Sequence, residues 1–553
     1  MRNRRVLALT MAMAMMGTTL AGCGNSGSSA PETTGSAPPS ATTGQTAGEN
    51  EGGEAVSDKP YEGVTVTWWT RLNPNVSSTY PNLGDTPWAE YVREQTGINI
   101  EFIHPTAGAE DEEFSILVAS GEYPDIIEYN KWVSYAGGPG AAINDGVIIS
   151  LDEVFAGKAP NIKKLMDEYP EIAKSIKTSG GSYYCFPLLR GLEQPNVTQF
   201  SDGILVRKDV LDELGLELPE TIDEWDTTLR AYKDYGFEVP FTTRKEWMKI
   251  VFSPGFDNWG DYYVEDGVVK NGLVEDSRRD FLLKMNEWYE DGLIDRDWLV
   301  ADKASNQTYF TTGKSAAVNA PFGQGLGQYT QIMHDADPDI TQEDIRGTVP
   351  VTSVKGQNAK FSRMNQIYDK AGMAATITTG CKNVDAAAWL LDWMYSEAGT
   401  LACNFGIEGV SYEIVDGKPL YTDTIMKNPD GLSVANALAA YTRASTNGIG
   451  IQDGDYILQY YEQENQKEAL ELCMKTDMGL YFYPPTNVAE EDQERFATIS
   501  NNVKTLSDEM EAKFIAGTAS LDDWDSYVDQ LNQLGMAEAI EMMQKAYDVY
   551  MAQ

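Results

Sequence analysis

After residue 60, some segments have apolar residues at every second position, and the segments between them have apolar residues at helical spacing. Apolar residues recur at every second position over 64–69, which predicts a strand, and the patterns at 98–103 and 123–129 predict two more. Between these strands, 86–95 and 111–120 carry apolar residues at helical spacing. Strands that alternate with helices indicate an α/β lobe with a largely parallel sheet, and ligands of such sheets bind at the carboxyl ends of the strands.

A second lobe is expected to start near Ile204, at the apolar segment ILVRKDVL. The spacing of Thr221 and Glu224 then predicts the start of a helix, because the two side chains can form a capping box that satisfies exposed backbone amides. Another amphipathic helix is predicted over 278–289 and should end at Gly292.

The remaining chain is predicted to return to a strand at 374–378 and to a helix at 384–395. The last stretch, 466–553, is mainly helical in pattern. Ser520 and Asp523 have the spacing of a second capping box. No internal repeat is found.

The first residues have the layout of a secretory signal. Three arginines within the first five residues precede an apolar run over 6–16 that is too short to span a bilayer. The run ends at Leu-Ala-Gly-Cys, which resembles the bacterial lipobox, so 1–22 is expected to be a removed signal and Cys23 to carry a lipid. Residues 23–60 are rich in Gly, Ser, Thr, Ala, Pro and Glu, which predicts a flexible tether.

Charge and length narrow the class of protein. The chain carries 84 acidic against 42 basic residues, a formal net charge of −42, so electrostatic repulsion disfavours nucleic acid and anionic lipid surfaces as partners. The length that follows the tether exceeds what one core usually supports, so at least two domains are expected. The 12 tryptophans and 29 tyrosines suit a large core, and they also suit a cleft that stacks sugar rings.

Metal-binding patterns are absent from the sequence. Four cysteines follow Cys23, at 185, 381, 403 and 473, without any CxxC pair, and only two histidines occur. Buried thiols are expected, and a Cys381–Cys403 disulfide is left open. Asp335, Asp337 and Asp339 begin like a calcium loop, but Ile340 and Arg346 stand where Gly and Glu are needed. No metal and no cofactor are therefore predicted.

Four segments together resemble the extracellular solute-binding proteins specific for oligosaccharides, family 1, in the lipoprotein branch of Gram-positive bacteria. They are PETIDEW at 219–225, YFTTGKSAAVNAPF at 309–322, the run over 374–413, and FIAGTASLDDWDSYVDQLNQLG at 514–535. The resemblance implies a periplasmic-binding-protein type II fold, in which two α/β lobes joined by a hinge close on a sugar and deliver it to a membrane permease.

The resemblance also implies that neither lobe is continuous in sequence. Lobe 1 is expected to comprise 61–200 plus 373–440, and lobe 2 is expected to comprise 201–372 plus 441–553. Alginate-binding relatives carry a calcium loop after the helix that corresponds to 222–235. The segment YGFEVP stands there instead, so no calcium is expected at that point.

Ten residues are candidate ligand contacts. Five follow predicted strands, where an α/β sheet binds its ligand: Trp69, Arg71, Asn130, Trp132 and Arg190. In the second lobe, Trp247 and Trp259 lie in polar or turn-rich stretches. The resemblance adds Phe322, Glu408 and Tyr412. Aromatic faces would stack on sugar rings, while Arg, Asn and Glu would bind hydroxyls. The GxGxG at 323–327 is expected to be a mobile loop beside the cleft.

The predicted function is the capture of an oligosaccharide for an ATP-binding cassette importer, without catalysis. The expected partners are the sugar, permease subunits supplied by other chains, and the membrane through the lipid on Cys23; the protein is expected to be a monomer on the outer face. The same fold could instead bind a peptide, a polyamine or another solute, or could serve as an adhesin or sensor. A surface glycoside hydrolase is the enzymatic alternative, but no catalytic motif is found.

Overall fold

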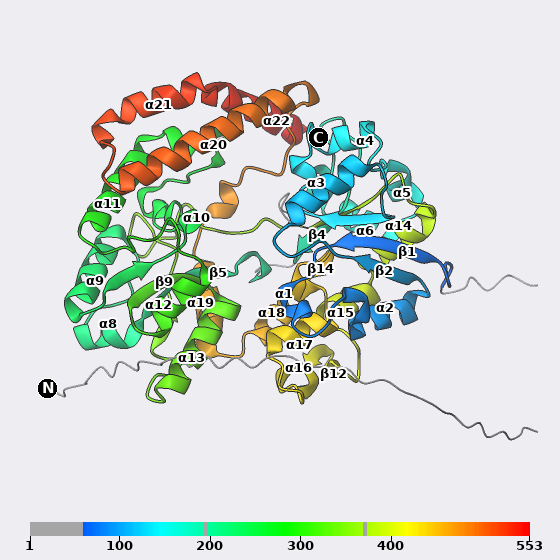
Figure 1. Ribbon diagram of the computed structural model, residues 1–553, viewed down its shortest axis with the longest axis horizontal. Coiled ribbons are helices and arrows are strands. Elements are labelled where there is room, and N and C mark those ends of the chain that lie inside the picture. The colour runs from blue at the N-terminus through cyan, green and yellow to red at the C-terminus, as the bar shows by residue number, and fades with distance from the viewer. Residues whose placement is uncertain (1–58, 193–196, 369–372, 553) are drawn as a thin grey trace, which may run out of the picture. The chain divides into compact units, whose positions relative to one another are not determined.

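The computed structural model describes residues 59–192, 197–368 and 373–552 (Figure 1). The predicted signal segment 1–22, the predicted lipidation site Cys23 and nearly all of the predicted tether lie outside the described residues. The folded part of the chain contains two main sheets, each surrounded by helices (Figure 1).

The five elements predicted from the first periodic segment are all present. They are β1 (Thr65–Thr70), α2 (Pro87–Thr96), β2 (Asn99–Ile103), α3 (Glu110–Ser120) and β3 (Ile126–Tyr129). Local chemistry sets the bounds of α2: the Thr86 hydroxyl accepts a hydrogen bond from the Ala89 amide, and Gly97 ends the helix at φ 72°.

The first sheet has six strands in the order β14-β4-β11-β3-β1-β2. Its later strands are β4 (Phe186–Arg190), β11 (Ala374–Ile377) and β14 (Gly450–Gln452). β1 is parallel to β2 and β3, and β14 is parallel to β4, whereas β11 is antiparallel to both of its neighbours. The sheet is therefore mixed, with β11 as its antiparallel strand. β11 joins the first sheet after the chain has passed through the strands of the second sheet.

The helices and the hairpin that follow the strands of the first sheet are short. They are α1 (Pro74–Ser77), α4 (Gly138–Asn144), α5 (Asp152–Gly157), α6 (Pro160–Glu168), α7 (Pro170–Ser175), α14 (Val384–Trp393), α15 (Glu397–Asn404), β12 (Tyr412–Val415), β13 (Lys418–Tyr421), α16 (Asp423–Met426), α17 (Val434–Tyr441) and α18 (Gly454–Tyr460). The core between these helices and the sheet contains the buried Trp68, Trp88 and Trp132.

The second sheet has four strands in the order β10-β5-β9-β6. They are β5 (Asp202–Arg207), β6 (Val239–Thr242), β9 (Ser315–Pro321) and β10 (Ile345–Gly347). β5 is antiparallel to β9 and β10, and β6 is parallel to β9. β9 is buried along almost its whole length, which explains its continuous run of small and apolar residues.

The helices that accompany the second sheet include the longest helices of the described residues, α20 (Gln493–Ile515) and α22 (Met536–Ala552). The others are α8 (Lys208–Leu214), α9 (Ile222–Tyr235), α10 (Lys245–Met248), α11 (Asp276–Glu290), α12 (Lys303–Thr311), α13 (Gln328–Ala336), α19 (Glu464–Cys473) and α21 (Trp524–Gln533). A small hairpin, β7 (Tyr262–Glu265) and β8 (Val268–Asn271), packs against α22.

One of the two predicted capping boxes is present. The Thr221 hydroxyl accepts from the Glu224 amide, and the Glu224 carboxylate accepts from the Thr221 amide, at the start of α9. The second prediction is wrong: the Ser520 hydroxyl accepts from the Asp522 amide at 3.1 Å and caps a short 3₁₀ turn, and α21 starts only after it.

The expected boundary at residue 440 differs from the observed strand pairing. The sequence places 441–553 in the second lobe, but β14 pairs in parallel with β4 in the first sheet. Ile449 belongs to the core of that sheet as well. The segment stays with the first sheet because an ion pair between Arg443 and Glu128 holds it there.

This buried arginine–carboxylate pair joins β3 to the segment that precedes β14. The Arg443 Nη2 donates to both carboxylate oxygens of Glu128, at 3.0 and 2.8 Å, and both side chains are almost fully buried. The Ile449 amide and the Trp68 indole also donate to this carboxylate. Glu128 is therefore fully bonded in an apolar core, and Arg443, which neutralises its charge, lies 315 residues later in the chain.

A second buried pair has the same role beside the other sheet. Arg278 of α11 donates through Nε and Nη2 to the Glu511 carboxylate of α20, at 2.8 and 3.0 Å, and each side chain is 1% exposed. The Arg278 Nη1 also donates to the Lys249 carbonyl at 2.8 Å. This pair ties the late helix α20 to a helix that lies more than two hundred residues earlier in the chain.

The cysteines in the described part of the chain are all free. Cys185, Cys403 and Cys473 are buried, and Cys381 is half-buried. Burial raises the pKa of the Cys381 and Cys403 thiols to about 12, so both stay protonated and unreactive near neutral pH. The disulfide that the sequence left open between them is not formed.

Replacing Arg443 by Met should lower the free energy of unfolding by about 3–5 kcal/mol, because the Glu128 carboxylate would remain buried without its cation. Chemical denaturation followed by circular dichroism measures this loss. The control is Arg495→Met, which breaks the exposed Arg495–Glu538 pair and should change stability little. Equal small effects of both variants would contradict the importance of the buried pair.

Candidate functional site

Two contiguous cavities form one groove in the folded part of the chain. Their volumes are about 410 and 620 Å³, and they share Asn75, Gly323, Ala435 and Tyr460. Each volume lies within the range of small-molecule sites in proteins. Because the lining comes from elements of both sheets, the groove is the place where one ligand would touch both.

The segments after two strands, one from each sheet, deliver side chains to the groove. After β1 the chain forms α1, and Asn73, Pro74 and Asn75 line the first cavity. At the end of β9, Pro321 and Gly323 line the opposite wall. The groove therefore lies a few residues beyond the carboxyl ends of β1 and β9, at the kind of position where the sequence analysis expects a ligand.

Helix α18 and the residue after it supply three tyrosines that line the groove. Tyr456, Tyr460 and Tyr461 line the first cavity, and Tyr460 lines the second as well. Tyr456 and Tyr461 are buried, so the half-buried Tyr460 is the one of the three whose ring is partly open to the groove. Burial raises the pKa of Tyr460 to about 12 and the pKa of Tyr456 and Tyr461 further above the ordinary value. The three hydroxyls therefore remain protonated near neutral pH and can both donate and accept hydrogen bonds.

The glycine-rich segment 322–327 is a π-helical turn that lines the groove. A Cβ at Gly323 would lie 2.6 Å from the Tyr460 ring, and a Cβ at Gly327 would lie 2.6 Å from the Gln466 amide. The Gln466 Nε2 also donates to the Phe322 carbonyl at 2.8 Å. The GxGxG pattern thus lets Tyr460 and Gln466 approach the backbone closely, and hydrogen bonds hold the segment in place.

Amides and hydroxyls make up most of the polar lining of the groove. They are Asn73, Asn75, Ser201, Gln328, Gln331, Ser433, Asn436, Ser445, Asn447, Gln463 and Gln466. Among the described residues, Lys303 is the charged group that lines the first cavity, and Glu462 is the one that lines the second. Burial raises the pKa of the Glu462 carboxyl. The groove is therefore nearly neutral in a protein with a net charge of −42.

Two tryptophans predicted to contact a ligand lie in the core beside the first sheet. The Trp69 ring meets Tyr129 edge-on at 5.3 Å, and the Trp132 ring meets Phe114 edge-on at 5.3 Å. Trp132 is 1% exposed. Both rings are enclosed by protein, so in this structure neither presents a face on which a sugar could stack.

The same correction applies to Phe322 and Tyr412. Phe322 is fully buried among apolar side chains beside the second sheet. Tyr412 is also buried, with its ring 6.0 Å from that of Phe405. The residue next to Phe322 reaches the groove, because Gly323 follows the end of β9.

Arg71, Asn130 and Arg190 lie at or just after the ends of strands, as predicted, but line neither cavity of the groove. The exposed Arg71 guanidinium lies 5.7 Å from the Tyr129 ring centre. The Arg190 Nη1 donates to the Gln452 side chain at 3.3 Å, which joins β4 to β14. Their roles as ligand contacts stay predictions.

Glu408 and Trp259 are also outside the groove. Glu408 is exposed in the turn before β12. The half-buried Trp259 ring stacks on Phe361, with 6.4 Å between the ring centres. These two roles stay predictions as well.

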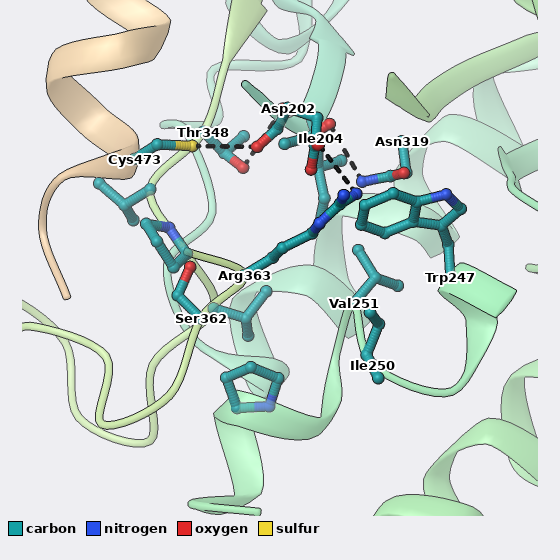
Figure 2. Close-up of a pocket in the computed structure, with 15 residues that line it drawn as sticks. Asp202, Ile204, Trp247, Ile250, Val251, Asn319, Thr348, Ser362, Arg363 and Cys473 are labelled. Carbon is teal, nitrogen blue, oxygen red and sulfur yellow. Dashed lines mark hydrogen bonds and ion pairs between the residues drawn. The ribbon is translucent and has the colours of Figure 1, made fainter. Parts of the chain in front are cut away.

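Trp247 is the predicted contact that does line a cavity. This third cavity has a volume of about 50 Å³ and lies beside β5 (Figure 2). The Arg363 guanidinium lies over the Trp247 ring, 4.2 Å from its centre. Trp247 is therefore covered by another side chain of the protein, in a position next to the groove.

The tyrosines of α18 and the amides at the start of α19 are lining residues that the sequence patterns did not single out. A usable signal is present in DGDYILQYY, where Asp453 caps a helix and Tyr456 and Tyr460 stand one turn apart. This spacing does not predict groove residues as long as the whole segment is assigned to the terminal helices of the second lobe.

Among the residues that the structure describes, no group of three or more His, Cys, Asp or Glu side chains could hold a metal ion. At the acidic segment 335–339, the Asp337 side chain accepts from the Asp339 amide, and the His334 ring bonds to the Ile340 carbonyl. Within the described ranges, no helix is long and apolar enough to cross a membrane.

Gly323→Ala should lower the free energy of unfolding by roughly 1–3 kcal/mol, because the added methyl group would overlap the Tyr460 ring. Denaturant titration measures the change. Gly157→Ala is the matched control, since a Cβ there would meet no atom within 4 Å. If Gly323→Ala were as stable as the control, the close fit between the turn and Tyr460 would be refuted.

Comparisons with known proteins agree with this architecture. The profile of the bacterial extracellular solute-binding protein family matches residues 75–401. The chain is 24% identical to the fructooligosaccharide ABC transporter substrate-binding protein FusA of Streptococcus pneumoniae, over 90% of this chain and 93% of that protein. It is 22% identical to lipoprotein LipO of Bacillus subtilis, over 84% of this chain and 89% of that protein.

A solved structure shows the same fold. The calcium-free alginate-binding protein AlgQ2 superposes with a TM-score of 0.70 at 24% identity, and the match covers 90% of this chain and 100% of that one. The periplasmic-binding-protein type II fold expected from the sequence is thereby confirmed. Because the family profile covers more than half of the sequence, the chain belongs to the bacterial extracellular solute-binding protein family.

Proposed function

We propose that this protein captures a neutral oligosaccharide in the groove and presents it to the permease of an ATP-binding cassette importer. The observation that carries the proposal is the lining of the groove: the half-buried Tyr460 at the end of α18 stands among amides and hydroxyls, and charged groups are scarce among the described lining residues. Tyrosine rings can stack on sugar rings, and amides can donate to and accept from sugar hydroxyls.

The same lining separates this proposal from the alternatives. A polyamine needs carboxylates to balance its charge, but Glu462 is the single carboxylate among the described residues that line the groove. Hydrolysis of a glycoside ordinarily uses a pair of carboxyl groups on either side of the scissile bond. The groove therefore favours capture of an uncharged polyol over binding of a cation, and over hydrolysis.

The relatives support a carbohydrate ligand, and FusA also supports a permease partner. FusA is named as a substrate-binding protein for fructooligosaccharides in an ABC transporter, and AlgQ2 is named for alginate. By extension, this chain would bind the solute outside the cell and rely on permease subunits supplied by other chains. It would act as a monomer and would catalyse no reaction.

We infer two lobes, one around each sheet, with the groove between them. Tyr460 packs against one apolar cluster that contains Phe322 and another that contains Phe405. The Asn365 amide donates to the Gln199 carbonyl where the chain crosses between the sheets. A ligand that touches both walls would favour the arrangement in which they approach each other, because its contacts differ between the two states.

The lipid anchor belongs to this proposal too. Cys23 follows Leu-Ala-Gly at the end of the apolar segment, and the relative LipO is named a lipoprotein. A lipid on Cys23 and a tether over 23–60 would hold the folded part near the outer face of the membrane.

Tyr460→Ala should weaken oligosaccharide binding by about tenfold or more, since it removes a stacking face and a hydroxyl from both cavities. The wild-type ligand is first found by thermal shift, with fructo- and malto-oligosaccharides tested against spermidine and short peptides. Titration calorimetry then compares the variants. Tyr235→Ala, which removes a tyrosine from the exposed side of α9, is the control and should bind normally. A melting shift with spermidine or peptides alone would contradict the proposal.

Cys23→Ala should release the protein from the membrane, because the thiol that receives the lipid is gone. Detergent phase partitioning of cells that express each form measures this. Wild-type protein should enter the detergent phase and the variant the aqueous phase; partitioning of both into detergent would refute lipidation at Cys23.

A further inference from the structure

The small cavity beside β5 brings together three side chains that are far apart in the sequence. Asp202 begins β5, Trp247 lies on α10, and Arg363 lies on the segment where the chain leaves the second sheet. Figure 2 shows the Arg363 side chain extending toward Asp202 and across the Trp247 ring, with Asn319 beside it. An aromatic face, a carboxylate, a guanidinium and an amide thus converge on one point.

Arg363 is held by two contacts. Its Nη1 lies 2.9 Å from the Asp202 carboxylate, and its guanidinium lies 4.2 Å from the centre of the Trp247 ring. The Arg363 side chain is 42% exposed, whereas that of Asp202 is 8% exposed. Arg363 is therefore the movable member of the group, and Asp202 and Trp247 are the fixed ones.

The cavity adjoins the groove. Asp202 pairs in register with Pro321, and both Pro321 and Ser201 line the first cavity of the groove. Two residues beyond Arg363, the Asn365 amide donates to the Gln199 carbonyl at 2.9 Å, where two crossings between the sheets run side by side. A ligand in the groove could therefore reach Trp247 past the first residues of β5.

Resting on the proposed function, we propose that Asp202, Trp247 and Arg363 form a subsite for one terminal ring of the oligosaccharide. The ring stacks on the Trp247 indole face, and its hydroxyls bond to the Asp202 carboxylate and the Arg363 guanidinium. In this structure, the Arg363 guanidinium occupies the position of that ring.

The sizes and energies of the contacts fit an exchange of this kind. The cavity of about 50 Å³ is too small for a sugar ring, so the guanidinium must turn outward to admit one. This turn takes the cation away from the Asp202 carboxylate, which is 8% exposed, so the hydroxyls of the incoming ring must bond to that carboxylate in its place. Stacking and charge-assisted hydrogen bonds to the ring then replace the contacts that Arg363 gives up.

Burial is consistent with this role of Asp202. Burial raises the pKa of the Asp202 carboxyl, and the Arg363 guanidinium opposes that rise. A carboxylate in such surroundings gains from any further hydrogen-bond donor, and vicinal sugar hydroxyls supply two.

The test uses ligands that differ by a single ring. Titration calorimetry of the full chain with fructo- and malto-oligosaccharides of increasing length should find a step at which one added ring strengthens binding by about tenfold. Trp247→Leu and Arg363→Met should each remove that step, while binding of the shorter ligand is kept. A residue with a merely structural role would weaken both ligands alike.

Lys360→Met is the matched control. Lys360 lies three residues before Arg363, pairs with Glu265 at 2.6 Å and lies over the Tyr263 ring, but it does not line the cavity. This variant should keep the step. If Trp247→Leu does not fold, Arg363→Met decides, because the Arg363 side chain is substantially exposed.

Two results would overturn the inference, and they can be told apart. If the wild type binds oligosaccharides and both variants keep the step, or lose affinity equally for short and long ligands, the subsite is wrong and the proposed function stands. If the wild type binds none of the oligosaccharides, the proposed function falls and the subsite falls with it.

Discussion

The Glu128–Arg443 ion pair fixes the point at which the late part of the chain rejoins the first sheet. The Glu128 carboxylate is buried at the centre of that sheet, and its partners include the guanidinium of Arg443 and the backbone amide of Ile449. Without a cation, the cost of burying this carboxylate would be several kcal/mol, so the segment 443–449 has one favourable position. β14 follows directly from it and then leads into α18, so the position of the groove tyrosines depends on this pair.

The pair formed by Arg278 and Glu511 does the same for the late helices beside the second sheet. In both pairs, the chain leaves one sheet, contributes strands to the other sheet and then returns before it reaches the second residue of the pair. A fold built in this way can bring the loops that follow β1 and β9 to the helix α18, although these elements are far apart in the sequence. A binding site with two walls follows from that arrangement.

The local elements could be predicted well from the sequence because local forces determine them. The alternation at 64–69 and the capping box at Thr221 require only neighbouring residues. Most of the groove could not be found in this way. Trp132 and Phe322 are aromatic residues of the kind that bind sugars, but both are buried. Tyr460 reaches the groove because β14 pairs with β4, and no periodicity in the sequence predicts that pairing. The crossing expected at residue 440 differs from the observed one for the same reason, since it is decided by a buried ion pair whose two residues, Glu128 and Arg443, lie over three hundred residues apart in the chain.

Hydrogen–deuterium exchange with and without a bound oligosaccharide shows whether one ligand engages both walls of the groove. If it does, protection should rise together at 73–75, at 321–328 and at 454–466, which form the two walls and the helix between them. Protection limited to the elements of one sheet, or found only at segments that do not line the groove, would contradict a two-walled binding site.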